Sequence, residues 1–83
     1  MRLRQVTIDE VKPGDTFTAT RDGLEIIKLI LLDIPVKGRF ETHVLHAHES
    51  TNLVQGKIYK LFKNHFEGWQ SSRTTKWRIE RYG

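Results

Sequence analysis

Three closely spaced histidines are the residues of this sequence best suited to metal chemistry. His43, His46 and His48 form an H-x-x-H-x-H run. Residues two apart on a β-strand project from the same face, so His46 and His48 could supply two imidazoles to a zinc ion. Glu49 or Asp33 would have to complete the site. Two ligands on one strand without an assured third do not predict a metal, and we expect no metal or other cofactor.

Other arrangements typical of catalysis are missing from the sequence. There is no Ser/His/Asp pattern, glycine-rich phosphate loop or pair of spaced carboxylates. The lack of cysteine excludes disulfides, thiolate zinc sites, iron–sulfur clusters and a cysteine nucleophile. A core built from 83 residues is also expected to leave little room for a pocket of about 300 Å³ or more. The sequence therefore predicts a binding module, not an enzyme, without a small-molecule substrate.

Positive charge and aromatic rings gather in the last third of the chain. Residues 1–56 hold seven Lys or Arg and eight Asp or Glu, whereas residues 57–83 hold seven and two. The net charge of +4 thus divides into −1 for the first segment and +5 for the second. The second segment also carries six of the eight aromatic residues. Cations interleaved with rings are typical of grooves that bind single-stranded nucleic acid.

The first prediction for function is therefore a basic, aromatic C-terminal surface that contacts nucleic acid mostly through phosphates. Trp69 and Tyr82 are the predicted stacking residues, Trp69 because it lies in a segment rich in Gly and Ser. The predicted phosphate-binding cations are Lys60, Lys63, Arg73, Lys76, Arg78 and Arg81. The same alternation also fits strands whose apolar residues are simply core and whose cations are solvated, so DNA, RNA and protein partners stay open.

The alternative is a protein-interaction module. A small basic domain could act as a regulator or inhibitor that docks on an acidic surface of a larger, nucleic-acid-processing enzyme, and such short domains suit viral or mobile-element proteins. The longest apolar run, residues 26–32, contains a lysine and is far shorter than the roughly 20 residues of a membrane span. We therefore expect no membrane partner and a cytoplasmic location.

A β-hairpin is predicted around Asp22-Gly23, the strongest two-residue signal for a tight turn. Residues 16–21 are β-branched and alternating, as in a strand. A type I′ turn would pair Arg21 with Leu24. In the same register Ala19 opposes Ile26 and Phe17 opposes Lys28, and the buried face is expected to carry Phe17, Ala19, Ile26, Ile30 and Leu32. The strand's far end is expected to be buried on both faces, with Ile27, Leu29 and Leu31 opposite.

A helix capped by Asp22 is the alternative for this segment, because Glu25 stands at the third position of a capping box. Its three isoleucines favour the strand. Further strands are predicted from alternation over residues 2–8, 39–47, 57–63 and 76–82. Turns are predicted at residues 11–15 and 34–38. Residues 48–55 are either a loop or one helical turn, and residues 64–75 are a loop with at most a short element at 66–69.

Two short blocks resemble the staphylococcal nuclease family, whose fold is an OB barrel. Gly14-Asp15-Thr16 is similar to the family's Asp-Gly-Asp-Thr block. Residues 28–35 are similar to its Arg-Leu-Leu-Leu-Val-Asp-Thr-Pro-Glu block, at a similar spacing. The resemblance implies that Asp15 and Asp33 are calcium ligands and that residues 52–61 match the family's helix end and following strand.

The sequence departs from that family at the positions that carry its chemistry. Pro13 replaces the first aspartate, Lys28 replaces an arginine, and Val36 stands where the family has its general-base glutamate. The resemblance therefore implies a non-catalytic relative with a degenerate nuclease-like OB fold. Together with five or six expected strands, it favours one domain over residues 1–83, an all-β, SH3-like or OB-like barrel in which closure removes exposed strand edges.

Overall fold

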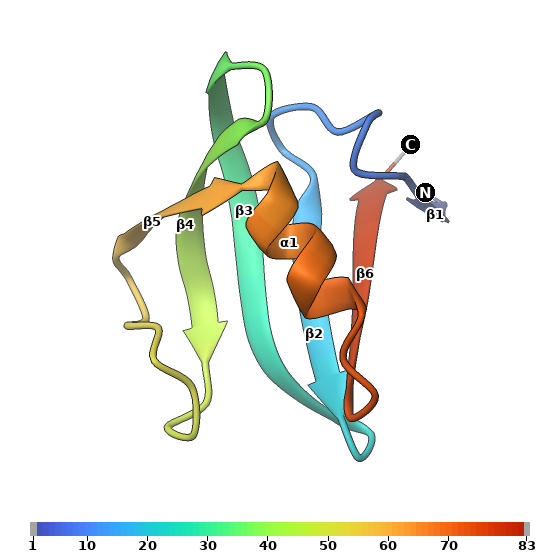
Figure 1. Cartoon of the computed structure of the whole chain (residues 1–83), viewed down its shortest axis with the longest axis vertical. Coiled ribbons are helices and arrows are strands. Elements are labelled where there is room, and N and C mark those ends of the chain that lie inside the picture. Colours follow the sequence, from blue (N-terminus) through green and yellow to red (C-terminus); the bar gives the residue numbers. More distant parts are fainter. Residues whose placement is uncertain (1, 83) are drawn as a thin grey trace.

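The computed structural model describes residues 2–82, which form one curved antiparallel sheet with a short helix on its inner side (Figure 1). The six strands follow the order β1-β6-β2-β3-β4-β5. Pairing among the described residues does not join β1 to β5, so the sheet is open. The elements are β1 (Leu3–Gln5), β2 (Thr16–Arg21), β3 (Leu24–Val36), β4 (Arg39–Ala47), β5 (Ile58–Phe62), α1 (Lys63–Gln70) and β6 (Thr75–Tyr82).

The hairpin between β2 and β3 forms at the predicted turn. Asp22 has φ of 52° and Gly23 has φ of 78°, and a type I′ turn requires positive φ at both central positions. Arg21 pairs with Leu24, as expected. The segment after the turn is a strand, not the helix that Asp22 would have capped.

A β-bulge changes the register beyond the first pairs of this hairpin. Thr20 opposes Glu25, but Ala19 opposes Ile27, so Ile26 is the extra residue of the bulge. Phe17 consequently opposes Leu29. The predicted pairs of Ala19 with Ile26 and of Phe17 with Lys28 are therefore wrong.

The shifted register also reverses the predicted faces of β3. Leu29 and Leu31 are buried on the inner side together with Phe17 and Ala19, whereas Leu32 is 45% exposed. Side chains alternate along a strand, so a slip of one residue exchanges the two faces. The expected burial of Ile30 and Leu32 with Phe17 is wrong, and so is the expectation that the far end of β3 is buried on both faces.

The helix α1 packs its single fully buried residue, Phe66, against the sheet. The Phe66 ring contacts Phe17 edge-on, with centroids 5.3 Å apart, and Trp77 edge-on at 5.4 Å. The N-cap residue, Phe62, makes no capping hydrogen bond through its side chain. An eight-residue helix without an N-terminal capping side chain is marginal on its own, so tertiary packing of Phe66 is what holds it.

The remaining boundaries agree with the sequence predictions in part. Residues 39–47 form a strand as predicted, and residues 48–57 form a loop without a helical turn. The first strand is shorter than residues 2–8, and the turn expected at 34–38 narrows to Lys37-Gly38 because β3 continues to Val36. The segment predicted as a loop at 64–75 is helical as far as Gln70. The short element left open at 66–69 lies within α1, and the loop prediction is wrong for the rest of 64–70. No helix within residues 2–82 is long and apolar enough to cross a membrane.

Candidate functional site

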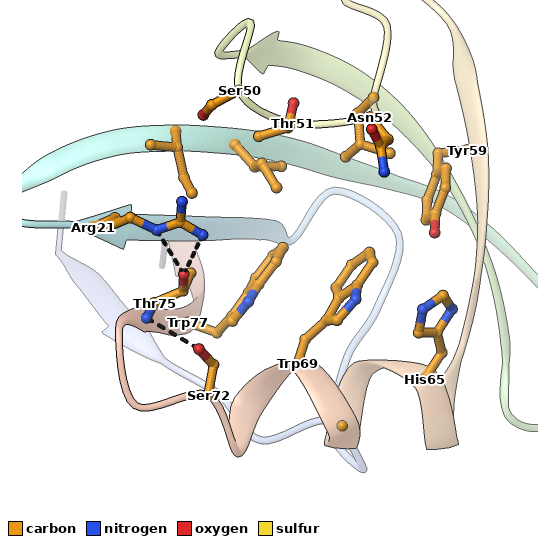
Figure 2. Close-up of a pocket in the computed structure, with 14 residues that line it drawn as sticks. Arg21, Ser50, Thr51, Asn52, Tyr59, His65, Trp69, Ser72, Thr75 and Trp77 are labelled. Carbon is orange, nitrogen blue, oxygen red and sulfur yellow. Dashed lines mark hydrogen bonds between the residues drawn. The ribbon is translucent and has the colours of Figure 1, made fainter.

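A hollow with a volume of about 500 Å³ lies between α1 and β6 on one side and the β4–β5 loop on the other (Figure 2). We call it the aromatic hollow, because Tyr59, Trp69 and Trp77 line it. The prediction that so small a core leaves little room for a pocket of about 300 Å³ or more is wrong. The physical reason is the curvature of the sheet, whose inner side is only partly filled by the single short helix.

The three aromatic rings form one stacked row, although each comes from a different element. Trp69 of α1 stacks on Trp77 of β6 with centroids 5.0 Å apart and planes 12° apart. Tyr59 of β5 stacks on the other side of Trp69 at 5.9 Å and 21°. His65 contacts Trp69 at 4.8 Å from within the same helix. The row is half-buried, and burial raises the pKa of the Tyr59 phenol, which stays neutral at physiological pH.

Local structure explains why these rings meet. Trp77 follows the buried Thr75 and precedes the buried Ile79 on β6, so alternation turns all three side chains inward. Trp69 lies three residues after Phe66, on the same face of the helix. Tyr59 lies on the inner side of β5, two residues before the buried Leu61. The packing of Phe66 therefore positions the row of rings.

Arg21 stands at one end of the aromatic hollow, at the end of β2. Its Nε and Nη2 atoms both donate to Oγ1 of Thr75, at 3.2 and 3.0 Å. The backbone N–H of Thr75 in turn donates to Oγ of Ser72 at 3.3 Å. These neutral contacts orient the guanidinium without neutralising it, and Arg21 forms no ion pair within residues 2–82.

A second hollow shares Arg21 with the first, and we call it the basic hollow. It lies at the β2–β3 turn, where the register places Lys76 opposite Thr20. Its charged residues are three cations, Arg21, Arg73 and Lys76, and one carboxylate, Asp22. None of the three cations forms an ion pair in the described part of the chain. The two hollows together present an aromatic site beside a cationic one.

The six cations predicted from the sequence do not form one surface. Arg73 and Lys76 line the basic hollow, whereas Lys60 lies on β5 opposite Glu41. The other three are held by carboxylates: Lys63 by Asp9 at 2.7 Å, Arg78 by Glu80 at 2.9 Å and Arg81 by Asp15 at 2.8 Å.

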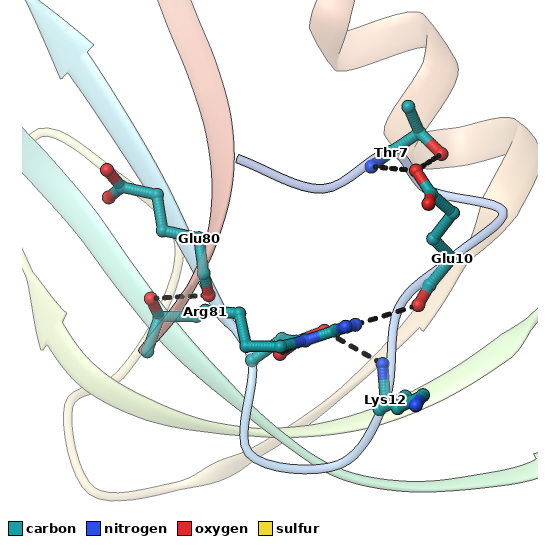
Figure 3. A network of polar contacts seen from close by, with 7 residues as sticks. Thr7, Glu10, Lys12, Glu80 and Arg81 are labelled. Atoms are coloured by element: carbon teal, nitrogen blue, oxygen red, sulfur yellow. Dashed lines mark hydrogen bonds and ion pairs between the residues drawn. The ribbon is translucent and has the colours of Figure 1, made fainter. Parts of the chain in front are cut away.

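Arg81 is part of a polar network that ties the last strand to the loop before β2 (Figure 3). Its Nε and Nη2 atoms donate to the two oxygens of Asp15, each at 2.8 Å, and Nη2 also donates to the carbonyl of Glu10 at 2.9 Å. The backbone N–H of Lys12 donates to the same carboxylate at 2.8 Å. The Arg81 guanidinium holds the pKa of Asp15 below its usual range. The network therefore fixes the loop before β2 to the end of β6, which is a structural role.

The same network engages Asp15, one of the two calcium ligands implied by the nuclease-like blocks. Both oxygens of Asp15 already accept hydrogen bonds, and the carboxylate is 2% exposed. Asp33 is exposed, and its Oδ1 accepts the backbone N–H of Ile34. Within residues 2–82, no group of three or more His, Asp or Glu side chains is placed to hold a metal ion.

Of the predicted stacking residues and metal-binding histidines, only Trp69 lines the aromatic hollow. Trp69 lies within the aromatic hollow, whereas Tyr82 is 67% exposed on β6 and does not line it. His46 pairs with Lys28 across the sheet. Nδ1 of His48 accepts the backbone N–H of Ser50 at 3.1 Å, so His48 shapes the β4–β5 loop.

Sequence reasoning missed Arg21, Tyr59 and Trp77 as members of the site. Trp77 lies in an alternating segment whose apolar residues fit a core equally well, and nothing local marks Arg21 as a neighbour of Thr75, which lies 54 residues away. Only the pairing of β2 with β6 brings them together. No family model, no curated protein and no solved structure matches this chain. A function is therefore inferred from geometry, charge and burial.

Proposed function

We propose that this chain is a non-catalytic domain that binds nucleic acid, mostly through phosphates, at the basic hollow. The observation that carries the proposal is the convergence of Arg21, Arg73 and Lys76 around one hollow, without ion pairs in the described residues, next to the aromatic hollow. Unpaired cations on a small surface attract a polyanion, and their counterions are released on binding.

This proposal narrows the surface predicted from the sequence. Of the predicted cations only Arg73 and Lys76 take part, and Arg21 joins them from the near-neutral first segment of the chain. Threonine hydroxyls from Thr20 and Thr74 line the same hollow and are suitable donors to phosphate oxygens. Contacts of this kind carry no direct information about base identity, so little sequence specificity is expected.

Removing two of the three cations of the basic hollow should weaken binding and reduce its dependence on salt. For single strands, each phosphate contact contributes about 0.7 to the slope of log affinity against log salt concentration. The double variant Arg73→Ala/Lys76→Ala should therefore lower the slope by about 1.4. Fluorescence anisotropy with a labelled oligonucleotide, titrated at several salt concentrations, measures this change.

The matched control is Lys57→Ala/Lys60→Ala, which removes the same charge from exposed positions at β5. It should leave the slope close to that of the wild type, because these lysines lie outside both hollows. Equal losses in the two double variants would show that net charge alone governs binding. Failure of the wild type to bind at about 50 mM salt would contradict the proposed function, since phosphate contacts are strongest at low salt.

Exposed apolar side chains favour a second candidate, a protein-docking surface. Ile58 and Phe62 on β5 are 55% and 42% exposed, and Val36 on β3 is 53% exposed. The Arg39 guanidinium lies over the Phe62 ring at 5.4 Å. A protein partner would cover this surface and would be retained in a pull-down from nuclease-treated extract.

We also propose that the curved sheet is a variant of the SH3-like or OB-like barrel. What supports this is the place of α1, which contacts both β5 and β6 and so spans the inner side between one edge strand and a strand near the other edge. In such an architecture the strands at the two edges do not pair with each other, and the helix covers the apolar residues that pairing would otherwise enclose. The aromatic hollow would then be the open mouth of the barrel.

A further inference from the structure

The row of rings in the aromatic hollow ends at Trp77, on the side where Arg21 lies. Trp77 stands between Trp69 and Arg21 in Figure 2, and the hydrogen bonds of Arg21 to Thr75 place its guanidinium beside the strand that carries Trp77. Within residues 2–82, no further ring continues the row beyond Trp77. The guanidinium makes no cation–π contact with Trp77. Trp77 and Arg21 both line the aromatic hollow, so this end of the row opens onto the hollow beside the guanidinium.

From this geometry we infer that the aromatic hollow takes one unpaired nucleobase, stacked on Trp77, so that the ligand class is single-stranded nucleic acid. The inference rests on the proposed function, because the same strand supplies the phosphates held at the basic hollow. A base on Trp77 extends the existing row by one ring. Its sugar and phosphate then reach Arg21, the residue that the two hollows share.

The position of the hollow excludes a paired base, and its size suits a single ligand ring system. A volume of about 500 Å³ lies within the range of about 300 to 1,000 Å³ that small-ligand sites occupy. In a duplex the bases are stacked on one another and paired, so none can enter a hollow between a helix and a loop without being unpaired. Single strands offer free faces that stack on aromatic side chains.

The wall opposite the rings offers few groups that could distinguish one base from another. It is formed by the β4–β5 loop, where Ser50, Thr51 and Asn52 face the hollow. The Ser50 hydroxyl is hydrogen-bonded to His48 at 2.8 Å, and the Thr51 hydroxyl donates to the His48 carbonyl at 2.7 Å. Both hydroxyls thus hold the loop itself. Asn52 is then the one group of this wall that can contact a base edge, so binding is driven mainly by stacking, which tolerates every base.

Intrinsic fluorescence can test the inference, because Trp69 and Trp77 are the two tryptophans of the chain and both line the hollow. The probes are an oligothymidylate of about eight nucleotides and a DNA duplex of similar length, titrated at low salt. We expect the single strand to quench the tryptophan fluorescence of the wild type. The duplex should bind more weakly and leave the fluorescence unchanged.

Two variants at Trp77 separate stacking from folding. Trp77→Phe keeps a flat ring and should retain affinity for the single strand within about threefold. Trp77→Ala should lower that affinity by about 5- to 100-fold, as expected for loss of one stacked base. Circular dichroism establishes that each variant is folded, because Trp77 also packs on Phe66. Tyr82→Ala is the matched control on the same strand and should bind like the wild type, since Tyr82 lies outside the hollow.

The outcomes distinguish this inference from the proposed function. Equal binding of single strand and duplex, without a change in tryptophan fluorescence, would overturn the base site while leaving phosphate binding intact. A folded Trp77→Ala variant with wild-type affinity would overturn it as well. Absence of binding to either probe at about 50 mM salt would contradict the proposed function itself.

Discussion

We expect Phe66→Ala to lower the free energy of unfolding by about 3 to 5 kcal/mol. Phe66 is completely buried and contacts Phe17 and Trp77 edge-on, so truncation leaves a cavity between the helix and the sheet. Small domains have total stabilities of about 5 to 15 kcal/mol, so this loss approaches the limit of what the fold tolerates. Urea denaturation followed by circular dichroism measures the change.

Phe62→Ala is the matched control, four residues earlier in the chain. The Phe62 ring is 42% exposed and lies on the far side of β5 from the core, where Arg39 contacts it. Its removal should change stability by less than about 1 kcal/mol, because surface truncations outside packed regions have small effects. Similar losses in both variants would contradict the assignment of Phe66 as the residue that anchors α1.

Phe66→Ala should also affect ligand binding, because α1 forms one wall of the aromatic hollow. Trp69 and His65 are in place only when the helix is docked. A ligand that binds only the docked state stabilises the fold by an amount that grows with the logarithm of its concentration once this exceeds the dissociation constant, so an oligonucleotide should raise the melting temperature of the wild type. The helix thus links the core of the protein to the candidate site.

Local chemistry predicted the β2–β3 turn, but it did not predict the register that follows. Asp22-Gly23 supplies the two positive φ angles that the turn needs, and this information is present in the two residues themselves. The bulge at Ile26 depends on which of two adjacent isoleucines fits the inner side of the curved sheet. Alternation counts both as apolar, so periodicity alone could not locate the extra residue.

The candidate site was predictable only where its residues are neighbours in sequence. Arg73 and Lys76 were identified from their cationic segment, and both line the basic hollow. Arg21 was not identified, because its contact with Thr75 depends on the pairing of β2 with β6. Sequence composition also counts every cation as free of ion pairs. Lys63 and Arg81 are held by carboxylates that are distant in sequence, whereas Arg78 is held by Glu80, two residues along the same strand.

The helix was missed for a related reason. Residues 63–70 lack an N-terminal capping side chain and include Gly68, so local propensity favours a loop. Burial of Phe66 and stacking of Trp69 supply the stabilisation that propensity does not. Tertiary packing thereby overrides the local preference, at the element that lines the aromatic hollow.

The second large loss of stability is expected on substitution of Asp15. Replacing it by asparagine should cost about 2 to 3 kcal/mol, the scale of hydrogen bonds to charged groups. The Asp15 carboxylate is 2% exposed, and its loss leaves the Arg81 guanidinium without its charge partner. Asp9→Asn is the matched control. Asp9 also pairs with a cation, Lys63, but its side chain is 71% exposed, and exposed pairs contribute little to stability. Urea denaturation at neutral pH compares the two variants.

The pH dependence of stability should identify the same residue. The pKa of Asp15 is lower in the folded protein than the value of about 3.9 for an unpaired aspartate, chiefly through its hydrogen bonds with Arg81. The unfolded chain therefore takes up this proton first as the pH falls. The stabilisation by Asp15 is complete above about pH 4 and is lost as the pH decreases through its folded-state pKa.

Asp9 and Glu10 also have lowered pKa values, so the wild type alone cannot assign this acid-induced loss to one group. The difference in stability between the wild type and Asp15→Asn isolates it. That difference should be constant from neutral pH to about pH 4 and should shrink below it, because protonated Asp15 no longer pairs with Arg81 as an anion. A difference that does not change down to about pH 2 would mean that the Asp15 contribution comes from packing and neutral hydrogen bonds, and not from its charge.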